Sequence, residues 1–151
     1  MDQTELREWE QRCIQEEPPP CTAACPLHVD ARAFIGHLQA GRWAEALKTL
    51  HKTMPLPGIL GRICDAPCRR ACNRKDAGEA IRIGDLEHAC VSRVDDSRRV
   101  MPLPAKDFKI AVAGSGLSSL TAAWDLARKG YTVTVTTSEA AVGARLLREH
   151  P

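Results

Sequence analysis

Residues 61–72 read GRICDAPCRRAC, and this stretch decides what kind of fold the chain needs. Cys64, Cys68 and Cys72 stand four residues apart, and Pro67 precedes the middle cysteine. Thiols grouped in this way form disulfides, hold a zinc ion or ligate an iron–sulfur cluster. Whether these thiols form disulfides, bind zinc or ligate a cluster therefore determines the scaffold that must surround them.

The whole chain carries seven cysteines in 151 residues, and the other four are Cys13, Cys21, Cys25 and Cys90. The N-terminus, MDQTELREWEQRC, is charged, and neither a secretory signal nor a membrane span is visible, so we expect a cytoplasmic protein. Cytoplasmic thiols are kept reduced, which argues against disulfides and for a metal centre. The odd number of cysteines fits a metal site, because such a site can take a non-cysteine ligand.

The cysteine spacing favours an iron–sulfur centre over zinc. Zinc sites often show a two-residue gap within each ligand pair, and neither cysteine group here has that gap. Cubane iron–sulfur clusters take four ligands each, mostly thiolates, and a proline often follows a ligating cysteine, as Pro26 follows Cys25. Spacing alone leaves a zinc-stabilised assembly module as an alternative.

The charge distribution gives little support to nucleic acid binding. Net charge is +2, both signs are interspersed, and no basic stripe alternates with aromatic residues, which make up only 4% of the chain. A short basic run comprises Arg69, Arg70, Arg74 and Lys75. It is an ordinary charged surface, or it offsets the negative charge of thiolate-ligated clusters, or it docks a partner.

Apolar residues at helical spacing predict four helices in the first part of the chain. Asp30 stands where it can cap one of them, and the prolines of EEPPPC and MPLPG end two others. We expect residues 21–30, CTAACPLHVD, to form a loop. Trp43, Leu47 and Leu50 share one face and are expected in the core. The predicted helices cover about residues 1–15, 31–39, 43–51 and 85–94.

The character of the sequence changes after a polar, proline-bearing linker at residues 97–106. FKIAVAG reads as a buried strand, LSSLTAAWDLARKG as an apolar-faced helix and YTVTVTT as a second strand, which is the βαβ order of a parallel sheet. We therefore expect a mainly α chain, with a helical metal-binding domain at 1–96 and a partial Rossmann-like βαβ unit at 107–151. Two parallel strands cannot cover both faces of their sheet, so this unit either frays or completes a sheet of a partner.

Three segments together carry a resemblance to a known family. They are PPPCTAACPLHVD, GRWAEALKTLHKTMPLPGILGRICDAPCRRACNR and EAIRIGDLEHAC. In this order they closely resemble the N-terminal iron–sulfur domain of the glutamate synthase small subunit. That family includes the N-terminal domain of dihydropyrimidine dehydrogenase and flavin-dependent NAD(P)H oxidoreductases of bacterial formate and metal-reducing systems. The resemblance covers about residues 10–92 and implies a helical domain with two [4Fe-4S] clusters.

The resemblance implies ligands for one of the two clusters. Cys25, Cys64 and Cys68 correspond to three thiolate ligands. Glu87 falls where one member of the family uses a glutamine side chain as the fourth ligand. A carboxylate is a harder ligand than a thiolate, so Glu87 is expected to change the potential of its cluster.

For the other cluster the resemblance implies Cys13, Cys21 and Cys72 as ligands. Here the chain departs from the family, because Glu16 stands where the usual fourth cysteine lies three residues after the first. Either Glu16 completes this cluster, or Cys90 does, or the cluster is incomplete; of the two residues, Cys90 is the one we favour.

A dinucleotide-binding fingerprint begins in AVAGSGLSSLTAA, at the place where this family has a flavin-binding Rossmann unit. Gly114 allows the tight turn, and Gly116 allows close approach of a pyrophosphate. Ser119 replaces the third glycine, Thr137 replaces the glutamate that holds the ribose hydroxyls, and Glu139 comes two residues late. FAD is therefore not expected on this chain alone.

These features predict a non-catalytic electron-transfer subunit of a larger cytoplasmic oxidoreductase complex. It would be a shortened relative that relays electrons between a partner flavin or NAD(P)H module and another redox centre. The expected partner is a flavoprotein or a molybdenum-, tungsten- or hydrogenase-type catalytic subunit in an obligate hetero-oligomer. The alternatives are part of a split flavin-dependent NAD(P)H oxidoreductase, whose flavin site a partner chain completes, and the zinc-stabilised assembly module.

Overall fold

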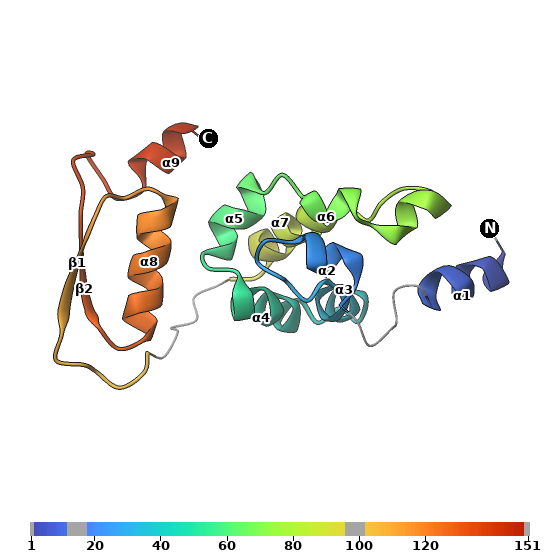
Figure 1. Ribbon diagram of the computed structural model, residues 1–151, viewed down its shortest axis with the longest axis horizontal. Coiled ribbons are helices and arrows are strands. Elements are labelled where there is room, and N and C mark those ends of the chain that lie inside the picture. The colour runs from blue at the N-terminus through green and yellow to red at the C-terminus, as the bar shows by residue number, and fades with distance from the viewer. Residues whose placement is uncertain (1, 12–17, 96–101, 150–151) are drawn as a thin grey trace. The chain divides into compact units, whose positions relative to one another are not determined.

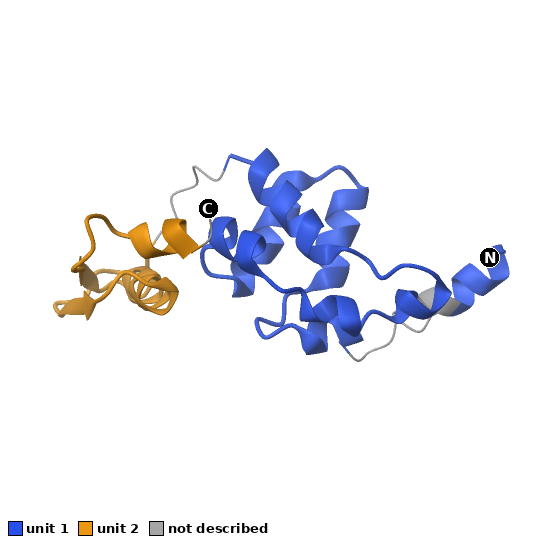
Figure 2. Cartoon of the chain, turned by 90° about the horizontal axis from the view of Figure 1, so that it is seen from above, with its two compact units in different colours: residues 1–96 blue, residues 97–151 orange. Residues whose placement is uncertain are grey.

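The structure is a computed structural model that describes residues 2–11, 18–95 and 102–149. The chain divides into two compact units, residues 1–96 and 97–151, which are coloured separately in Figure 2. The first unit is helical, and the second contains the two strands (Figure 1). The predicted fold class, mainly α with a partial βαβ unit, is confirmed.

Short helices joined by tight turns build the first unit. The helices predicted at 31–39, 43–51 and 85–94 are all present, the second running two residues further than predicted and the third starting two residues earlier. The predicted helix at 1–15 is present as a shorter one, and the remainder of that prediction lies outside the described residues. In chain order the elements are α1 (Gln3–Gln11), α2 (Pro20–Ala24), α3 (Ala31–Gln39), α4 (Trp43–Thr53), α5 (Pro57–Ile63), α6 (Pro67–Arg70), the 3₁₀ helix η1 (Asn73–Ala77) and α7 (Ile83–Arg93).

The start of α3 shows how the local sequence sets a helix boundary. The Asp30 carboxylate accepts a hydrogen bond from the Ala33 N–H at 3.0 Å, which is the predicted N-cap. The helix ends at Gln39, and two residues later Gly41 has a φ of +69°, a left-handed conformation that glycine adopts without a steric penalty.

The loop predicted at residues 21–30 is wrong in its first part, because α2 occupies Pro20–Ala24. Proline lacks an N–H, but the first-turn N–H groups of a helix have no intrahelical partner anyway, so Pro20 suits this start. The N–H groups of Thr22 and Ala23 both donate to the Pro19 carbonyl, at 2.8 and 3.1 Å. The proline run predicts only the end of a helix, whereas Pro20 also begins one.

The core of the first unit forms where α4 packs against α3 and α7. Phe34, Leu47, Leu50 and Cys90 are fully buried in it, and Trp43 packs against it half-buried. The predicted core face of α4 is therefore confirmed. Around this core, α5 packs on α7 and α2 packs on α6, so the four elements that carry or adjoin cysteines are held in two packed pairs.

The second unit pairs β1 (Lys109–Ala113) with β2 (Thr132–Thr136) in parallel, with α8 (Leu117–Arg128) as the crossover helix. Lys109 lies opposite Thr132 and Ala113 opposite Thr136. Alternate residues of both strands are half-buried, and α8 packs on both strands, so these residues form the covered face of the sheet. A helix that the sequence did not predict, α9 (Ala144–Glu149), follows.

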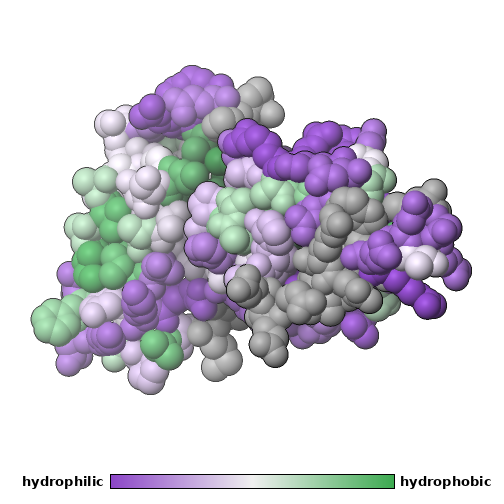
Figure 3. Space-filling model, turned by 45° about the vertical axis from the view of Figure 1, so that its right-hand side comes forward, coloured by the Kyte–Doolittle hydropathy of each residue, from purple (hydrophilic) through white to green (hydrophobic). Residues whose placement is uncertain are grey.

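Hydrophobic side chains reach the surface of the second unit, as the hydropathy view shows (Figure 3). The large exposed ones are Leu103, Phe108, Val142 and Leu147, between 56% and 74% exposed. A single helix on a two-stranded sheet cannot cover them. In the described parts of the chain, no helix is both long and apolar enough to cross a membrane.

Candidate metal centre

Four elements of the first unit bring one group of predicted ligands together. Cys25 caps the C-terminus of α2 and Cys64 that of α5, while Cys68 lies in the first turn of α6. Glu87 lies in the middle of α7. Because α2 packs on α6 and α5 packs on α7, residues up to 62 positions apart in the chain converge.

The electrostatics of Cys68 show that these groups are neighbours. Burial raises the pKa of the Cys68 thiol to about 11, and the negative charges of Glu87, Cys64, Cys25 and Cys21 contribute to the rise. Each of these four acidic groups therefore lies within electrostatic reach of one thiol. Several acidic side chains held together in this way are stabilised when a cation binds among them.

Cys64 also has acidic groups around it, and one hydrogen bond stabilises its thiolate form. Burial raises the pKa of its thiol, and the charges of Glu87 and Asp65 act in the same direction. The Ala66 N–H donates to the Cys64 Sγ at 3.4 Å and opposes this rise. Ala66 adopts a left-handed φ of +51°, which turns the backbone just after the cysteine.

Glu87 is a buried carboxylate, only 5% exposed. Within the described residues no hydrogen bond or ion pair reaches it, and burial alone raises its pKa to about 7. An ionised carboxylate without a partner is costly to bury, so this side chain suits a position beside a bound cation. The side chain chemistry of the group, three thiols and one such carboxylate, fits four ligands of an iron–sulfur cubane.

The spacing of these side chains differs from that of a preformed single-ion site. In the residues that the structure describes, no three His, Cys, Asp or Glu side chains stand close enough together to grip one metal ion. A cubane takes one ligand at each of four separate iron atoms, so its ligands stand further apart than those of one zinc ion. Among the described residues, no two cysteines are joined in a disulfide.

Part of the second group of predicted ligands lies at a pocket of about 280 Å³. Cys21 and Cys72 both line it, and α2, α3 and η1 form its walls. Cys13 and Glu16 lie outside the described residues. Helix α1 ends two residues before Cys13 and contacts η1, which directly follows Cys72. Described residues on both sides of Cys13 and Glu16 therefore lie beside elements that line this pocket.

Cys90 lies apart from the pocket, in the apolar core. Its side chain is fully buried, and its Sγ donates to the Trp43 carbonyl oxygen at 3.6 Å. It is not among the pocket-lining residues or among the charges that act on Cys68. Its role as a cluster ligand stays a prediction that this position does not favour.

The sequence did not predict that part of α3 lines the pocket at Cys21 and Cys72. Arg32, Ile35, Gly36 and Gln39 all line the pocket. Their spacing of three, four and seven residues is that of one helix face, so helical periodicity could have identified them once the pocket was known. The sequence also gave no sign that Cys21 serves both groups, since it lines the pocket and its charge acts on Cys68.

The glycine turn of the second unit keeps part of the dinucleotide-binding geometry. Gly114 has a φ of +103°, and a side chain at Gly116 would meet nothing within 4 Å. The backbone at Gly116 is therefore open to close approach. Ser119, in place of the third glycine, donates to the Ala113 carbonyl at 3.4 Å.

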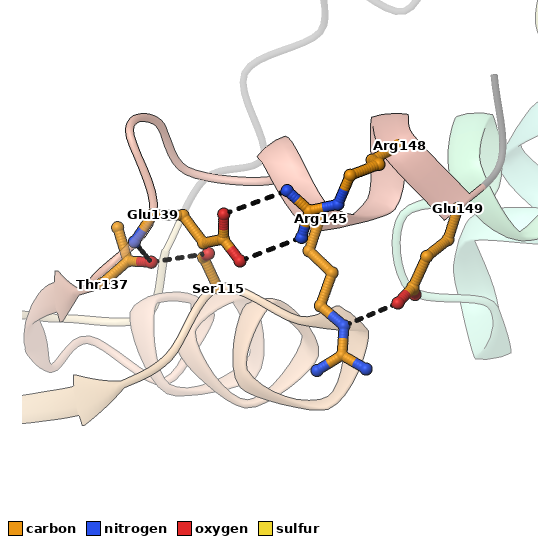
Figure 4. A network of polar contacts seen from close by, with 6 residues as sticks. All are labelled: Ser115, Thr137, Glu139, Arg145, Arg148 and Glu149. Atoms are coloured by element: carbon orange, nitrogen blue, oxygen red, sulfur yellow. Dashed lines mark hydrogen bonds and ion pairs between the residues drawn. The ribbon is translucent and has the colours of Figure 1, made fainter.

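The end of β2, where the family places its ribose-binding glutamate, is occupied by the chain's own polar network (Figure 4). The Thr137 hydroxyl hydrogen-bonds to the Ser115 hydroxyl at 2.9 Å and accepts from the Glu139 N–H at 3.1 Å. Both terminal nitrogens of Arg148 donate to the Glu139 carboxylate, at 3.4 and 3.2 Å. The Glu139 carboxylate, two residues past this position, is therefore paired with Arg148.

Known proteins match the chain over most of its length. Residues 1–99 match the family described as dihydropyrimidine dehydrogenase domain II, 4Fe-4S cluster. The glutamate synthase (NADPH) small chain of Mycobacterium tuberculosis is 34% identical over 148 residues, which cover 96% of this chain and 30% of that protein. Subunit beta of the NADPH-Fe(3+) oxidoreductase of Geobacter sulfurreducens is 32% identical over 127 residues, covering 82% and 19%.

A third relative is subunit beta of the NADP(+)-dependent formate dehydrogenase of Moorella thermoacetica, 31% identical over 140 residues that cover 77% of this chain and 20% of that protein. The chain spans less than a third of the length of each of these relatives. The family match includes every cysteine of the chain, and it confirms the resemblance read from the motifs. The chain belongs to the dihydropyrimidine dehydrogenase domain II family of [4Fe-4S] cluster domains.

Proposed function

We propose that this chain is an iron–sulfur electron-transfer subunit of a larger oxidoreductase complex, and that it carries two [4Fe-4S] clusters. The observation that carries the proposal is the convergence of Cys25, Cys64 and Cys68 with Glu87, a buried carboxylate to which no partner is recorded among the described residues. These four groups hold one cluster. When bound, the cluster accepts and releases single electrons, and the helices fix its position and its surroundings.

The second cluster is assigned to the pocket between Cys21 and Cys72, with Cys13 as the third thiolate. The burial of Cys90 in the apolar core favours Glu16 over Cys90 as the fourth ligand. A carboxylate would then complete each cluster, Glu87 in one and Glu16 in the other.

The partners follow from the names of the relatives. Two of those relatives are beta subunits, and their names join NADPH or NADP(+) to a second substrate, Fe(3+) or formate. We propose a partner flavoprotein or a metal-dependent catalytic subunit, with this chain passing electrons between the two centres in an obligate hetero-oligomer. The lack of a disulfide between any two described cysteines suits the reducing cytoplasm.

Anaerobic purification of the whole chain tests the proposal. A brown protein with iron and sulfide in equal amounts, filling two [4Fe-4S] clusters, and with absorbance that bleaches on reduction is the expected result. A colourless protein with stoichiometric zinc would instead establish the assembly-module alternative. A normally folded protein without any metal would overturn both.

One observation favours a second candidate function, a split flavoprotein. The backbone at Gly116 remains open to close approach, so a partner chain could complete a flavin site begun here. The pairing of Glu139 with Arg148 opposes it, because the carboxylate nearest the ribose position is already engaged. Copurification of yellow flavin whose contacts include Gly116 would support this function, and a flavin-free complex would remove it.

A further inference from the structure

One hydroxyl group joins the start of α2 to the start of α3. The Thr22 hydroxyl, on α2, donates to the Val29 carbonyl oxygen at 3.0 Å and accepts from the Ala31 N–H at 3.4 Å. Ala31 is the first residue of α3, where a backbone N–H has no partner within its own helix. A single side chain therefore satisfies two backbone groups, seven and nine residues further along the chain.

The hydrogen bond from Thr22 to Val29 closes a loop, residues 22–29, and Cys25 lies inside it. The Cys25 N–H donates to the Thr22 carbonyl oxygen at 3.2 Å. The Cys25 carbonyl oxygen accepts from the His28 N–H at 2.9 Å. Both backbone polar groups of Cys25 are thus bonded within the loop, so the position of this cysteine depends on how firmly the loop is closed.

The loop contains a turn that needs support from outside. His28 has a φ of +48°, a left-handed conformation that is unfavourable for a residue with a side chain. Such a conformation persists only where the surrounding contacts hold it. The next residue, Val29, is buried and accepts the hydrogen bond from Thr22. The hydroxyl therefore holds the backbone directly beside the unfavourable turn.

The position of Cys25 matters because its fellow ligands come from other helices. Helix α2 packs on α6, which carries Cys68 in its first turn. Cys25 also packs against the apolar core to which Cys68 belongs. A cubane takes one ligand at each of four iron atoms, so a displaced ligand weakens the hold on the whole cluster. Removing a group that orients a ligand typically costs about ten- to a hundredfold in metal affinity.

We infer that Thr22 is a positioning residue for the proposed cluster at Cys25 and Cys68, because its hydroxyl closes the loop that fixes the Cys25 backbone. This inference rests on the proposed function. Thr22 does not ligate the cluster. It acts through the backbone of Cys25 and leaves the ligand set unchanged.

Two matched pairs of chains, purified whole and without oxygen, test the hydroxyl. Thr22→Val replaces the hydroxyl of the unsubstituted chain with a methyl group, and Thr22→Ala differs from Thr22→Ser by the hydroxyl alone. In each pair, the member without the hydroxyl should release iron to a ferrous chelator roughly tenfold faster. Circular dichroism shows whether each variant keeps its helices. If Thr22→Val does not fold, the comparison of Thr22→Ser with Thr22→Ala decides the test.

Electron paramagnetic resonance of the reduced chain gives a readout that a general loss of stability would not move. Loss of the Thr22 hydroxyl should change one of the two cluster signals and leave the other as it is. Thr49→Val is the matched control, because Thr49 is buried in the same unit and its hydroxyl donates to the Glu45 carbonyl oxygen at 3.1 Å within α4. This control should keep both signals and the rate of iron release.

The outcomes distinguish this inference from the proposed function. Equal rates of iron release from Thr22→Ser and Thr22→Ala would overturn the inference and leave the electron-transfer function intact. An equally fast release from Thr49→Val would also overturn it, because a general loss of stability would then be the cause. Failure of the unsubstituted chain to take up iron and sulfide would overturn both.

Discussion

The helical unit and the βαβ unit of this chain differ most in how much each can bury. In the first, Phe34, Leu47 and Leu50 are completely shielded from solvent. In the second, the buried residues among those described are Ala123 and Ser115, and no side chain is as deeply enclosed. Several short helices can surround a shared centre, but one main helix on two strands covers only one face. The deeper core therefore belongs to the unit that contains the cysteines.

The two units also divide the reactive residues. All seven cysteines lie before residue 97, whereas the strands of the second unit are rich in threonine, valine and alanine. Cluster ligands must be held at fixed positions to set potential and distance, and this requires a rigid scaffold. The second unit has exposed hydrophobic side chains instead. We therefore still expect it to complete the sheet of a partner protein.

The largest expected effect comes from removing one proposed ligand of the cluster at Cys25, Cys64, Cys68 and Glu87. Cys68→Ala should lose one complete cluster, because a cubane needs all of its ligands, and should halve the iron content. Cys90→Ala is the matched control, another buried cysteine of the same unit, and should keep both clusters. Iron analysis and absorbance measure both variants. Loss of iron in Cys90→Ala would restore Cys90 as a ligand.

Truncating one apolar side chain in each unit tests whether the first unit has the more deeply buried core. Phe34→Ala should lower the free energy of unfolding by about 3–5 kcal/mol, because a fully buried aromatic ring leaves a cavity. Val133→Ala, at a half-buried position of β2, should cost only about 1 kcal/mol. Hydrogen exchange resolved by peptide measures the two units separately. Equal costs would mean that the second unit has a core as tight as the first.

A backbone substitution tests the turn that precedes β2. Gly130 has a φ of +88°, and a side chain there would collide with the Pro104 carbonyl oxygen and lie 2.9 Å from that of Leu103. Gly130→Ala should therefore destabilise the second unit by about 1–3 kcal/mol. Gly143→Ala, with a φ of +80° but open space around it, should cost about 1 kcal/mol from the backbone alone. Thermal unfolding compares the two, and a smaller cost at Gly130 would contradict the collision.

The smallest effect is expected at the ion pair that links α9 to the loop after β2. Arg148→Ala should cost at most about 1 kcal/mol, because the Arg148 and Glu139 side chains are 64% and 32% exposed. Arg145→Ala, which removes the separate pair with Glu149, is the control of similar exposure. Urea unfolding at low and high salt measures both. A loss well above 1 kcal/mol that persists in high salt would show that this pair holds the second unit together.

Several short elements escaped prediction for a common reason. Helices α2, α5 and α6 have between four and seven residues, too few for a helical period or for stability on their own. Helix α2 packs on α6 and helix α5 packs on α7, and this packing stabilises the two short helices α2 and α5. Both of them begin with a proline in the first turn. Local sequence shows the proline but not the neighbour that stabilises the turn.

The sequence by itself determined the family, the long helices, the Asp30 cap and the βαβ order, because apolar periodicity, capping residues and ordered motifs act within a few residues of chain. Only the tertiary structure decided which thiols lie within electrostatic reach of one another, that Glu87 is buried and that Cys90 lies in the core. It also decided that Cys21 and Cys72 line one pocket. These features depend on contacts between helices distant in sequence, and side-chain packing sets such contacts rather than local preference.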